Sequence, residues 1–240
     1  MLATILQDIR VKISLFNRER KFNTFMDFVK PTPQTTILDV GFTAFESAES
    51  YNFLEKNYPY PHNITALGLD DPTDFMKHYP QVKAVQYDGG RFPFEDKAFD
   101  VCWSNAVLEH VGNKDKQKMF LEEINRVSKL AFVTTPDKHF PIEVHTNVFL
   151  LHSFLSKENF DKYLRFVGKE WGTGDWLNLL SEKDIKELLA SMGIERYEII
   201  KNKLGLFTLD FVIIWDDLES RLTPNHGEKA AALYSVGSPV

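Results

Sequence analysis

The sequence predicts an α/β fold in which seven short strands form a mostly parallel sheet, with helices on both faces. Two observations lead to this prediction. Short apolar runs rich in β-branched residues alternate along the chain with helical stretches, a pattern typical of parallel sheets. The chain of 240 residues, 43% of them hydrophobic, is also long enough to form one domain with a substantial core.

Seven runs of the sequence are expected to form the strands. The first run follows Pro31 and Pro33, which end a preceding helix. The fifth run is closed by Pro136, after which the regular alternation stops. In chain order the expected strands are residues 36–41, 64–70, 82–87, 99–104, 130–135, 194–201 and 206–215.

Helices are expected before the first strand, between several of the strands and in the long segment after the fifth strand. Ser156 can cap a helix that Gly168 ends. Ser181 and Asp184 form a capping box for a later helix. In chain order the expected helices are residues 1–30, 45–57, 114–128, the segment from Ser156 to Gly168 and the segment from Ser181 to Gly193.

The domain organisation follows from these elements. We expect a single domain over residues 1–221, in which residues 1–30 form a helical cap and residues 136–180 form an insert. The insert is longer than most connections in an α/β domain. The small and polar residues 222–240 are expected to form a flexible tail.

Composition and charge exclude several classes of protein. No apolar run approaches the ~20 residues that cross a bilayer, and no export signal opens the chain. The single cysteine, Cys102, agrees with a reducing, cytoplasmic location. A net charge of −6 argues against nucleic acid as a partner. Residues 1–30 are locally basic, which fits either peripheral contact with a membrane or a helix packed on the domain; the protein is expected to be a monomer or a homodimer.

Polar residues follow four successive expected strands, where ligands bind in an open parallel sheet. Gly41 has no Cβ, so the backbone there can approach a ligand closely. Asp70 can accept hydrogen bonds from ribose hydroxyls, and Asp88 can accept one from an adenine amine. Asn105 can bind the amino-acid part of a cofactor. The alternative is that aspartate and glycine end these strands only because they form turns.

Several segments together resemble the class I S-adenosylmethionine-dependent methyltransferases, in the branch called methyltransferase type 11. The similar segments span residues 35–135 and are 37–41, 67–70, 88–100 and 104–111. This resemblance implies a Rossmann-like methyltransferase fold with one antiparallel strand, and S-adenosylmethionine as the cofactor. The residues implied to border the cofactor are Asp39, Gly41, Phe42, Asp70, Asp71, Asp88, Gly89, Asn105 and Ala106.

The loop after the first strand departs from the family pattern. The family has two or three alternating glycines there, whereas this chain has only Gly41, followed by the bulky residues Phe42 and Phe45. The small residues Thr43 and Ala44 can still let the loop close. The absence of a G-x-G-x-x-G motif argues against nicotinamide enzymes. A non-catalytic methyltransferase-like binding protein is the alternative that this loop leaves open.

Two places in the sequence offer a base for methyl transfer to a hydroxyl group. The preferred base is His145, with Glu143 as its orienting or acidic partner, in the insert where this fold recognises its acceptor. His110, which follows the fourth strand, is the second candidate. Each of these residues could instead be structural. No metal site is expected, because His139, His145 and His152 have no ligand spacing typical of zinc. The expected reaction is methylation, most readily at oxygen, of a small molecule or of a cell-surface glycan or lipid, as in polysaccharide biosynthesis.

Overall fold

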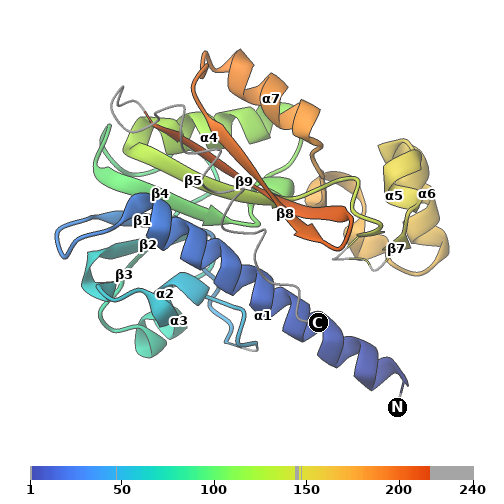
Figure 1. The fold of residues 1–240 in the computed structure, drawn as a ribbon, viewed down its shortest axis with the longest axis horizontal. Helices are drawn as coiled ribbons and strands as arrows, with labels where there is room; N and C mark the ends of the chain where they lie inside the picture. Colours follow the sequence, from blue (N-terminus) through green and yellow to red (C-terminus); the bar gives the residue numbers. More distant parts are fainter. Residues whose placement is uncertain (1, 47, 144–145, 147, 217–240) are drawn as a thin grey trace, which may run out of the picture.

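The alternation of strands and helices in the sequence becomes one seven-stranded sheet with the strand order β3-β2-β1-β4-β5-β9-β8 (Figure 1). The computed structural model describes residues 2–46, 48–143, 146 and 148–216. The strands are β1 (Ile37–Val40), β2 (Ile64–Gly68), β3 (Lys83–Gln86), β4 (Phe99–Asn105), β5 (Ser128–Pro136), β8 (Glu198–Leu204) and β9 (Phe207–Asp216).

The strand directions confirm the predicted mixed sheet. β1 pairs in parallel with β2 and β4, β2 with β3, and β4 with β5. β9 is antiparallel to both β5 and β8, so it is the one strand of this sheet that runs against the others. Because the order of the strands reverses between β1 and β4, the carboxyl ends of these two strands open a crevice at that edge.

Helices cover both faces of the sheet (Figure 1). One face carries α4 (Lys114–Val127) and α7 (Glu182–Ser191), whose apolar stripes join a core that contains Phe120, Ile124 and Leu189. The other face carries α1 (Leu2–Val29), α2 (Phe53–Asn57) and α3 (Thr73–His78), with Phe25 and Phe75 fully buried. Of the helices described, none is both long and apolar enough to cross a membrane.

The segment between β5 and α7 lies to one side of the sheet (Figure 1). It contains the small hairpin of β6 (Ile142–Glu143) and β7 (Val148–Phe149), then α5 (Leu151–Phe154) and α6 (Lys157–Phe166). Ser156 caps α6, and the capping box of Ser181 and Asp184 begins α7, both as predicted. Two single turns, η3 (Glu170–Gly172) and η4 (Gly174–Trp176), lead back towards the sheet.

The prediction of a helix over residues 45–57 was wrong, because only Phe53–Asn57 is helical. Asn52 interrupts any longer helix: its backbone is left-handed, with φ of 45°. Its side chain accepts a hydrogen bond from the Thr43 amide at 3.0 Å and donates one to the Thr43 carbonyl at 2.9 Å. These bonds hold Thr43 beside Asn52, so the helix cannot begin before Phe53. The short helix α3 was not predicted, and β8 begins at Glu198 rather than at residue 194. The proposed tail 222–240 lies outside the described residues.

Candidate functional site

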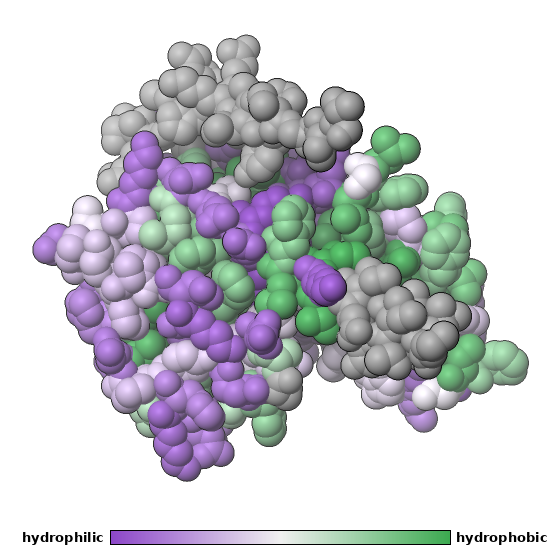
Figure 2. All heavy atoms as spheres, turned by 60° about the horizontal axis from the view of Figure 1, so that its bottom comes forward, coloured by the Kyte–Doolittle hydropathy of each residue, from purple (hydrophilic) through white to green (hydrophobic). Residues whose placement is uncertain are grey.

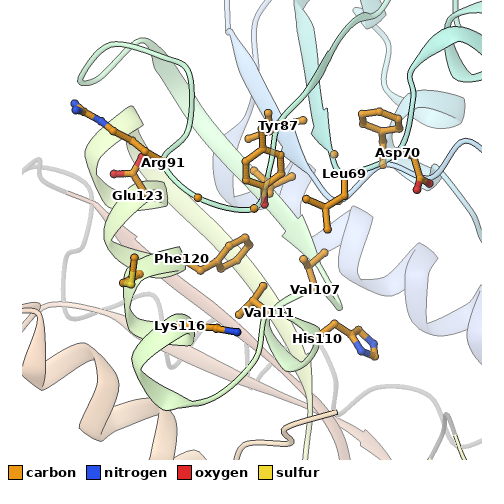
Figure 3. A pocket seen from close by; sticks show the side chains of 18 of the residues that line it. Leu69, Asp70, Tyr87, Arg91, Val107, His110, Val111, Lys116, Phe120 and Glu123 are labelled. Atoms are coloured by element: carbon orange, nitrogen blue, oxygen red, sulfur yellow. The ribbon is translucent and has the colours of Figure 1, made fainter. Parts of the chain in front are cut away.

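A cleft of about 620 Å³ opens at the carboxyl ends of β1, β2 and β4. This volume is in the range of small-molecule sites, which is about 300–1,000 Å³. Figure 3 shows Asp70 and His110 towards one end of the cleft and Arg91 and Glu123 towards the other. Between them, hydrophobic side chains line the walls, including Leu69, Tyr87, Val107, Val111 and Phe120. The cleft is therefore apolar at its centre and polar at both ends.

Gly41 occupies the turn that leaves β1, and no other residue type suits its geometry. Its φ is 112°, in the region that side chains disfavour, and its amide donates to the Leu67 carbonyl at 2.8 Å. A Cβ at this position would lie 2.3 Å from Cγ2 of Val107. The loops after β1 and β4 thus approach each other as closely as a glycine permits.

The two aromatic residues of this loop do not fill the cleft. Phe42 is buried, and its ring packs on Phe75 with centroids 4.5 Å apart and against the backbone of Gly68, where a Cβ would lie 2.7 Å from the ring. Only part of Phe42 contributes to the cleft wall. Phe45 is 70% exposed and is not among the residues that line the cleft. A glycine-poor loop is therefore accommodated by turning one ring into the core.

The carboxylates after β2 and β3 differ in position. Asp70 lines the cleft and accepts a hydrogen bond from the Ala44 amide at 3.1 Å, which ties the first loop to the end of β2. Asp71 does not line it; this carboxylate accepts from the Thr73 amide at 2.8 Å, and hydrogen bonds from Thr73 lower its pKa. Asp88 accepts from the Gly90 amide at 2.9 Å and so shapes the turn whose Gly89 does line the cleft.

Asp39, Asn105 and Ala106 lie around the ends of β1 and β4. Asp39 is buried and is not among the residues that line the cleft. Asn105 accepts a hydrogen bond from the Thr134 hydroxyl at 2.8 Å. Ala106 lines the cleft with a φ of 59°, and its amide donates to the Thr134 carbonyl. Of the nine predicted cofactor residues, the structure therefore brings Gly41, Phe42, Asp70, Gly89 and Ala106 together in the cleft lining.

One wall of the cleft was not predicted. Lys116, Phe120 and Glu123 of α4 all line it, at the helical spacing that places them on one face of the helix. Glu123 accepts a hydrogen bond from the Phe92 amide at 2.8 Å, and two bonds from Arg126 hold the pKa of Glu123 below its usual value. Arg126 also binds the carbonyls of Phe92 and Phe94, so this pair fixes the Pro-Phe loop before β4.

Tyr87 was also missed as a site residue. Burial, with a smaller contribution from Asp88, raises the pKa of Tyr87 to about 12. Its phenol therefore keeps its proton at neutral pH and remains a hydrogen-bond donor. Tyr87 directly follows β3, and the sequence could have identified it from this position, because residues at the ends of β1 and β2 also line the cleft.

The three predicted catalytic residues have different surroundings. His110 lines the cleft; its Nδ1 lies 2.9 Å from the carbonyl of Trp176, and the two rings are 4.8 Å apart. Glu143 is buried in the insert, where the amide and hydroxyl of Thr146 both donate to it. His145 lies outside the described residues. His152 is buried too; burial lowers its pKa, and its Nε2 is 2.9 Å from the Phe140 carbonyl.

Comparisons with known proteins agree with this architecture. Residues 38–130 match the type 11 family described as a methyltransferase domain. No curated protein matches the chain in sequence. Among solved structures, protein PH0226 of Pyrococcus horikoshii is 13% identical, with a TM-score of 0.52, over 81% of this chain and 86% of that one.

Two further solved structures share the fold. DszA carbon methyltransferase is 18% identical, with a TM-score of 0.53, over 81% of this chain and 51% of that one. Phosphoethanolamine N-methyltransferase 2 of Haemonchus contortus, in complex with phosphomonomethylethanolamine and S-adenosylhomocysteine, is 15% identical, with a TM-score of 0.51, over 76% and 38% of the two chains. The chain therefore carries a methyltransferase domain of the type 11 family over residues 38–130, within the Rossmann-like sheet of the S-adenosylmethionine-dependent methyltransferases.

Proposed function

We propose that the protein transfers the methyl group of S-adenosylmethionine to a hydroxyl group of a small molecule or of a cell-surface glycan or lipid. The observation that carries this proposal is the cleft itself, in which a tight glycine turn and a carboxylate meet at the reversal point of the sheet. When bound, the cofactor supplies an electrophilic methyl group. The residues of the chain then have to hold the cofactor, align the acceptor and remove a proton.

The lining residues suit the parts of this cofactor. Asp70 offers an oxygen to the ribose hydroxyls, and Gly41 leaves room for the methionine part beside the first loop. Gly89 and the ring of Tyr87 form an apolar place for the adenine. Ala106, next to Asn105, lies at the end that we assign to the sulfonium, near His110.

His110 is the proposed base that the described residues support best. A carbonyl oxygen can only accept, so in the neutral ring Nδ1 carries the hydrogen towards Trp176 and Nε2 is the basic nitrogen. Positioning of the acceptor can lower the barrier by about 7–11 kcal/mol, and proton removal adds about 10²–10⁴-fold. His145, with Glu143 as its partner, is kept as the second proposed base.

The surface supports an acceptor that is attached to, or dissolved in, a membrane. In the view of Figure 2, hydrophobic side chains gather on the side of the molecule that carries the insert and the β8–β9 turn in Figure 1. The insert has exposed Phe149 and Phe154, and the β8–β9 turn has exposed Leu206 and Phe207. The protruding start of α1 carries exposed Lys12 and Phe16, which fits peripheral contact with an anionic membrane from the cytoplasm.

Calorimetric titration of S-adenosylmethionine and S-adenosylhomocysteine into wild-type protein and Asp70→Ala tests the cofactor site. We expect Asp70→Ala to weaken binding by about 10–100-fold, because ribose hydroxyls lose a charged acceptor. Asp74→Ala is the matched control, since Asp74 is an exposed carboxylate on neighbouring α3 that pairs only with Lys77 among the described residues. Unchanged binding by Asp70→Ala would contradict the assignment of Asp70.

A further inference from the structure

Two of the four tryptophans of this chain are exposed, and they stand side by side. Trp171 is 56% exposed and Trp176 is 39% exposed, whereas Trp103 and Trp215 are buried. The rings of Trp171 and Trp176 are 5.1 Å apart and nearly perpendicular, at 83°. A surface where large apolar side chains adjoin one another in contact with water is a binding site more often than the rest of a protein's surface. We call Trp171, Trp176 and the adjoining ring of His110 the aromatic wall.

The aromatic wall is continuous with the cleft through His110. The His110 ring lines the cleft and contacts Trp176 both by its Nδ1 and by its ring. The end of the insert is also bonded to the turn that carries His110, because the Asn178 amide donates to the Glu109 carbonyl at 2.8 Å. Gln117 of α4 donates to the Asn178 carbonyl at 2.9 Å. A molecule on the tryptophan rings would thus lie next to the end assigned to the reacting methyl group.

The loop that carries the aromatic wall is built to hold one shape. The Gly174 amide donates to the buried Asp161 at 3.0 Å, and Gly174 has a φ of 71°. Gly172 is buried against the insert, where a Cβ would lie 2.9 Å from Cγ2 of Thr146. Rings fixed in advance lose little conformational entropy when they bind a ligand. The wall is therefore a preformed surface.

Charges around the aromatic wall are balanced. The exposed carboxylates of Glu170 and Asp175 flank the two rings, and Lys116 lies 3.8 Å from Asp175. Lys169 directly precedes Glu170 in the chain and donates to the carbonyl of Thr146. Two of these four charged side chains are acidic and two are basic, so together they carry no net charge that would favour a cation. It offers flat apolar faces surrounded by hydrogen-bonding groups.

We propose that the aromatic wall binds a sugar ring of the acceptor. A pyranose presents an apolar face of C–H bonds, which packs on an aromatic ring, and a rim of hydroxyls, which hydrogen-bond to carboxylates and amines. An acyl chain has no hydroxyl groups, so it could not form hydrogen bonds with the polar side chains around the wall. This inference rests on the proposed methyl transfer to a hydroxyl group and narrows its acceptor to a saccharide.

Acrylamide quenching of tryptophan fluorescence tests this proposal without requiring turnover. Since the other two tryptophans are buried, the quencher reaches mainly the wall, and a bound sugar should protect it. The probes are the methyl pyranosides of glucose, galactose, mannose and N-acetylglucosamine, titrated into protein saturated with S-adenosylhomocysteine. We expect at least one probe to reduce quenching in a saturable manner.

Variants then place the binding on the aromatic wall. Isothermal titration should show that Trp171→Ala and Trp176→Ala weaken binding of the protective probe by about fivefold to tenfold, while Trp171→Phe and Trp176→Phe retain most of it. Phe166→Ala is the control, because Phe166 is 88% exposed on α6 and takes no part in the wall. All variants should bind S-adenosylhomocysteine like the wild type, which separates a failure of the wall from a failure of the cofactor site.

Three outcomes would overturn the proposal. The first is that none of the four pyranosides protects the tryptophans. The second is that the alanine variants bind the protective probe as tightly as the wild type does. Protection by tetramethylammonium and by none of the sugars would instead assign the wall to an organic cation, held by cation–π attraction.

Discussion

Gly41 and Val107 show how a single missing Cβ sets the width of the cleft. The two residues come from the loops after β1 and β4, and they touch where those loops converge. The resemblance to the family predicts a glycine at this position. It does not predict Val107 as the side chain that makes the glycine necessary, because that contact depends on the relative position of two strands.

Gly41→Ala is expected to destabilise the fold and to weaken cofactor binding. The new Cβ would clash with the stiff, β-branched Val107, and the φ of 112° would be strained for any side chain. We expect the free energy of unfolding in urea to fall by about 1–3 kcal/mol. The double variant Gly41→Ala/Val107→Ala should recover only the part caused by the clash. Equal stability of Gly41→Ala and wild type would show that this turn is not constrained as described.

At the scale of elements, helix α1 is fastened to the last strand of the sheet by buried polar contacts. Lys21 pairs with Asp210 of β9 at 3.1 Å, and both side chains are buried. Asp210 also accepts hydrogen bonds from Asn17 of α1 and from Asn202 of β8. Burial lowers the pKa of Lys21, an effect that Asp210 opposes. The two members of this pair therefore differ in how many other partners they have.

This difference predicts unequal effects of removing either charge. Asp210→Ala leaves Lys21 buried, with the Thr134 hydroxyl at 3.5 Å, and should cost about 3–5 kcal/mol of unfolding free energy. Lys21→Met leaves Asp210 with both asparagine donors and should cost clearly less. Urea unfolding gives the two values, and hydrogen exchange of α1 amides shows whether the helix detaches first. A larger loss for Lys21→Met would contradict this account of the pair.

The elements that the sequence predicted well are those whose signals are local. Caps at Ser156 and Ser181 lie within one helical turn of what they stabilise, and strands such as β5 and β9 have continuous apolar runs. The helix predicted over 45–57 failed because Asn52 bonds back to Thr43, a contact that only the loop geometry creates. The same limit applies to the site: strand ends were visible in the sequence, but the wall formed by α4 depends on packing across the sheet.

At the scale of the whole molecule, buried carboxyl groups make stability depend on pH. Asp39 and Glu55 are neighbours in the interior, and burial raises the pKa of both. The charge of Glu55 raises the pKa of Asp39 further, and Arg18 opposes this. Well below the unfolded-state pKa values of about 4, both groups are protonated in the folded and unfolded chains, and their contribution to stability is fully present. That contribution is lost as the pH rises through the folded-state pKa values.

Glu55→Gln is therefore expected to stabilise the protein at pH 7, by roughly 1–3 kcal/mol, because the amide keeps the shape and carries no charge to bury. The gain should shrink as the pH falls towards 4. Urea unfolding at several pH values between 4.5 and 8 measures it, with the exposed Glu95→Gln as control. A loss of stability at pH 7, or a gain independent of pH, would show that Glu55 is held as a favourable charge.

The contact between α1 and β9 also determines when α1 can dock during synthesis of the chain. Asn17 and Asp210 are 193 residues apart in the chain, yet they bond directly. During translation α1 leaves the ribosome early, and its Lys21 finds its partner only after β9 has been made. Docking of α1 is then a late, long-range closure, of the kind that loop entropy makes slow. Until it happens, Phe25 and the face of the sheet that it covers stay open to chaperones or to other nascent chains.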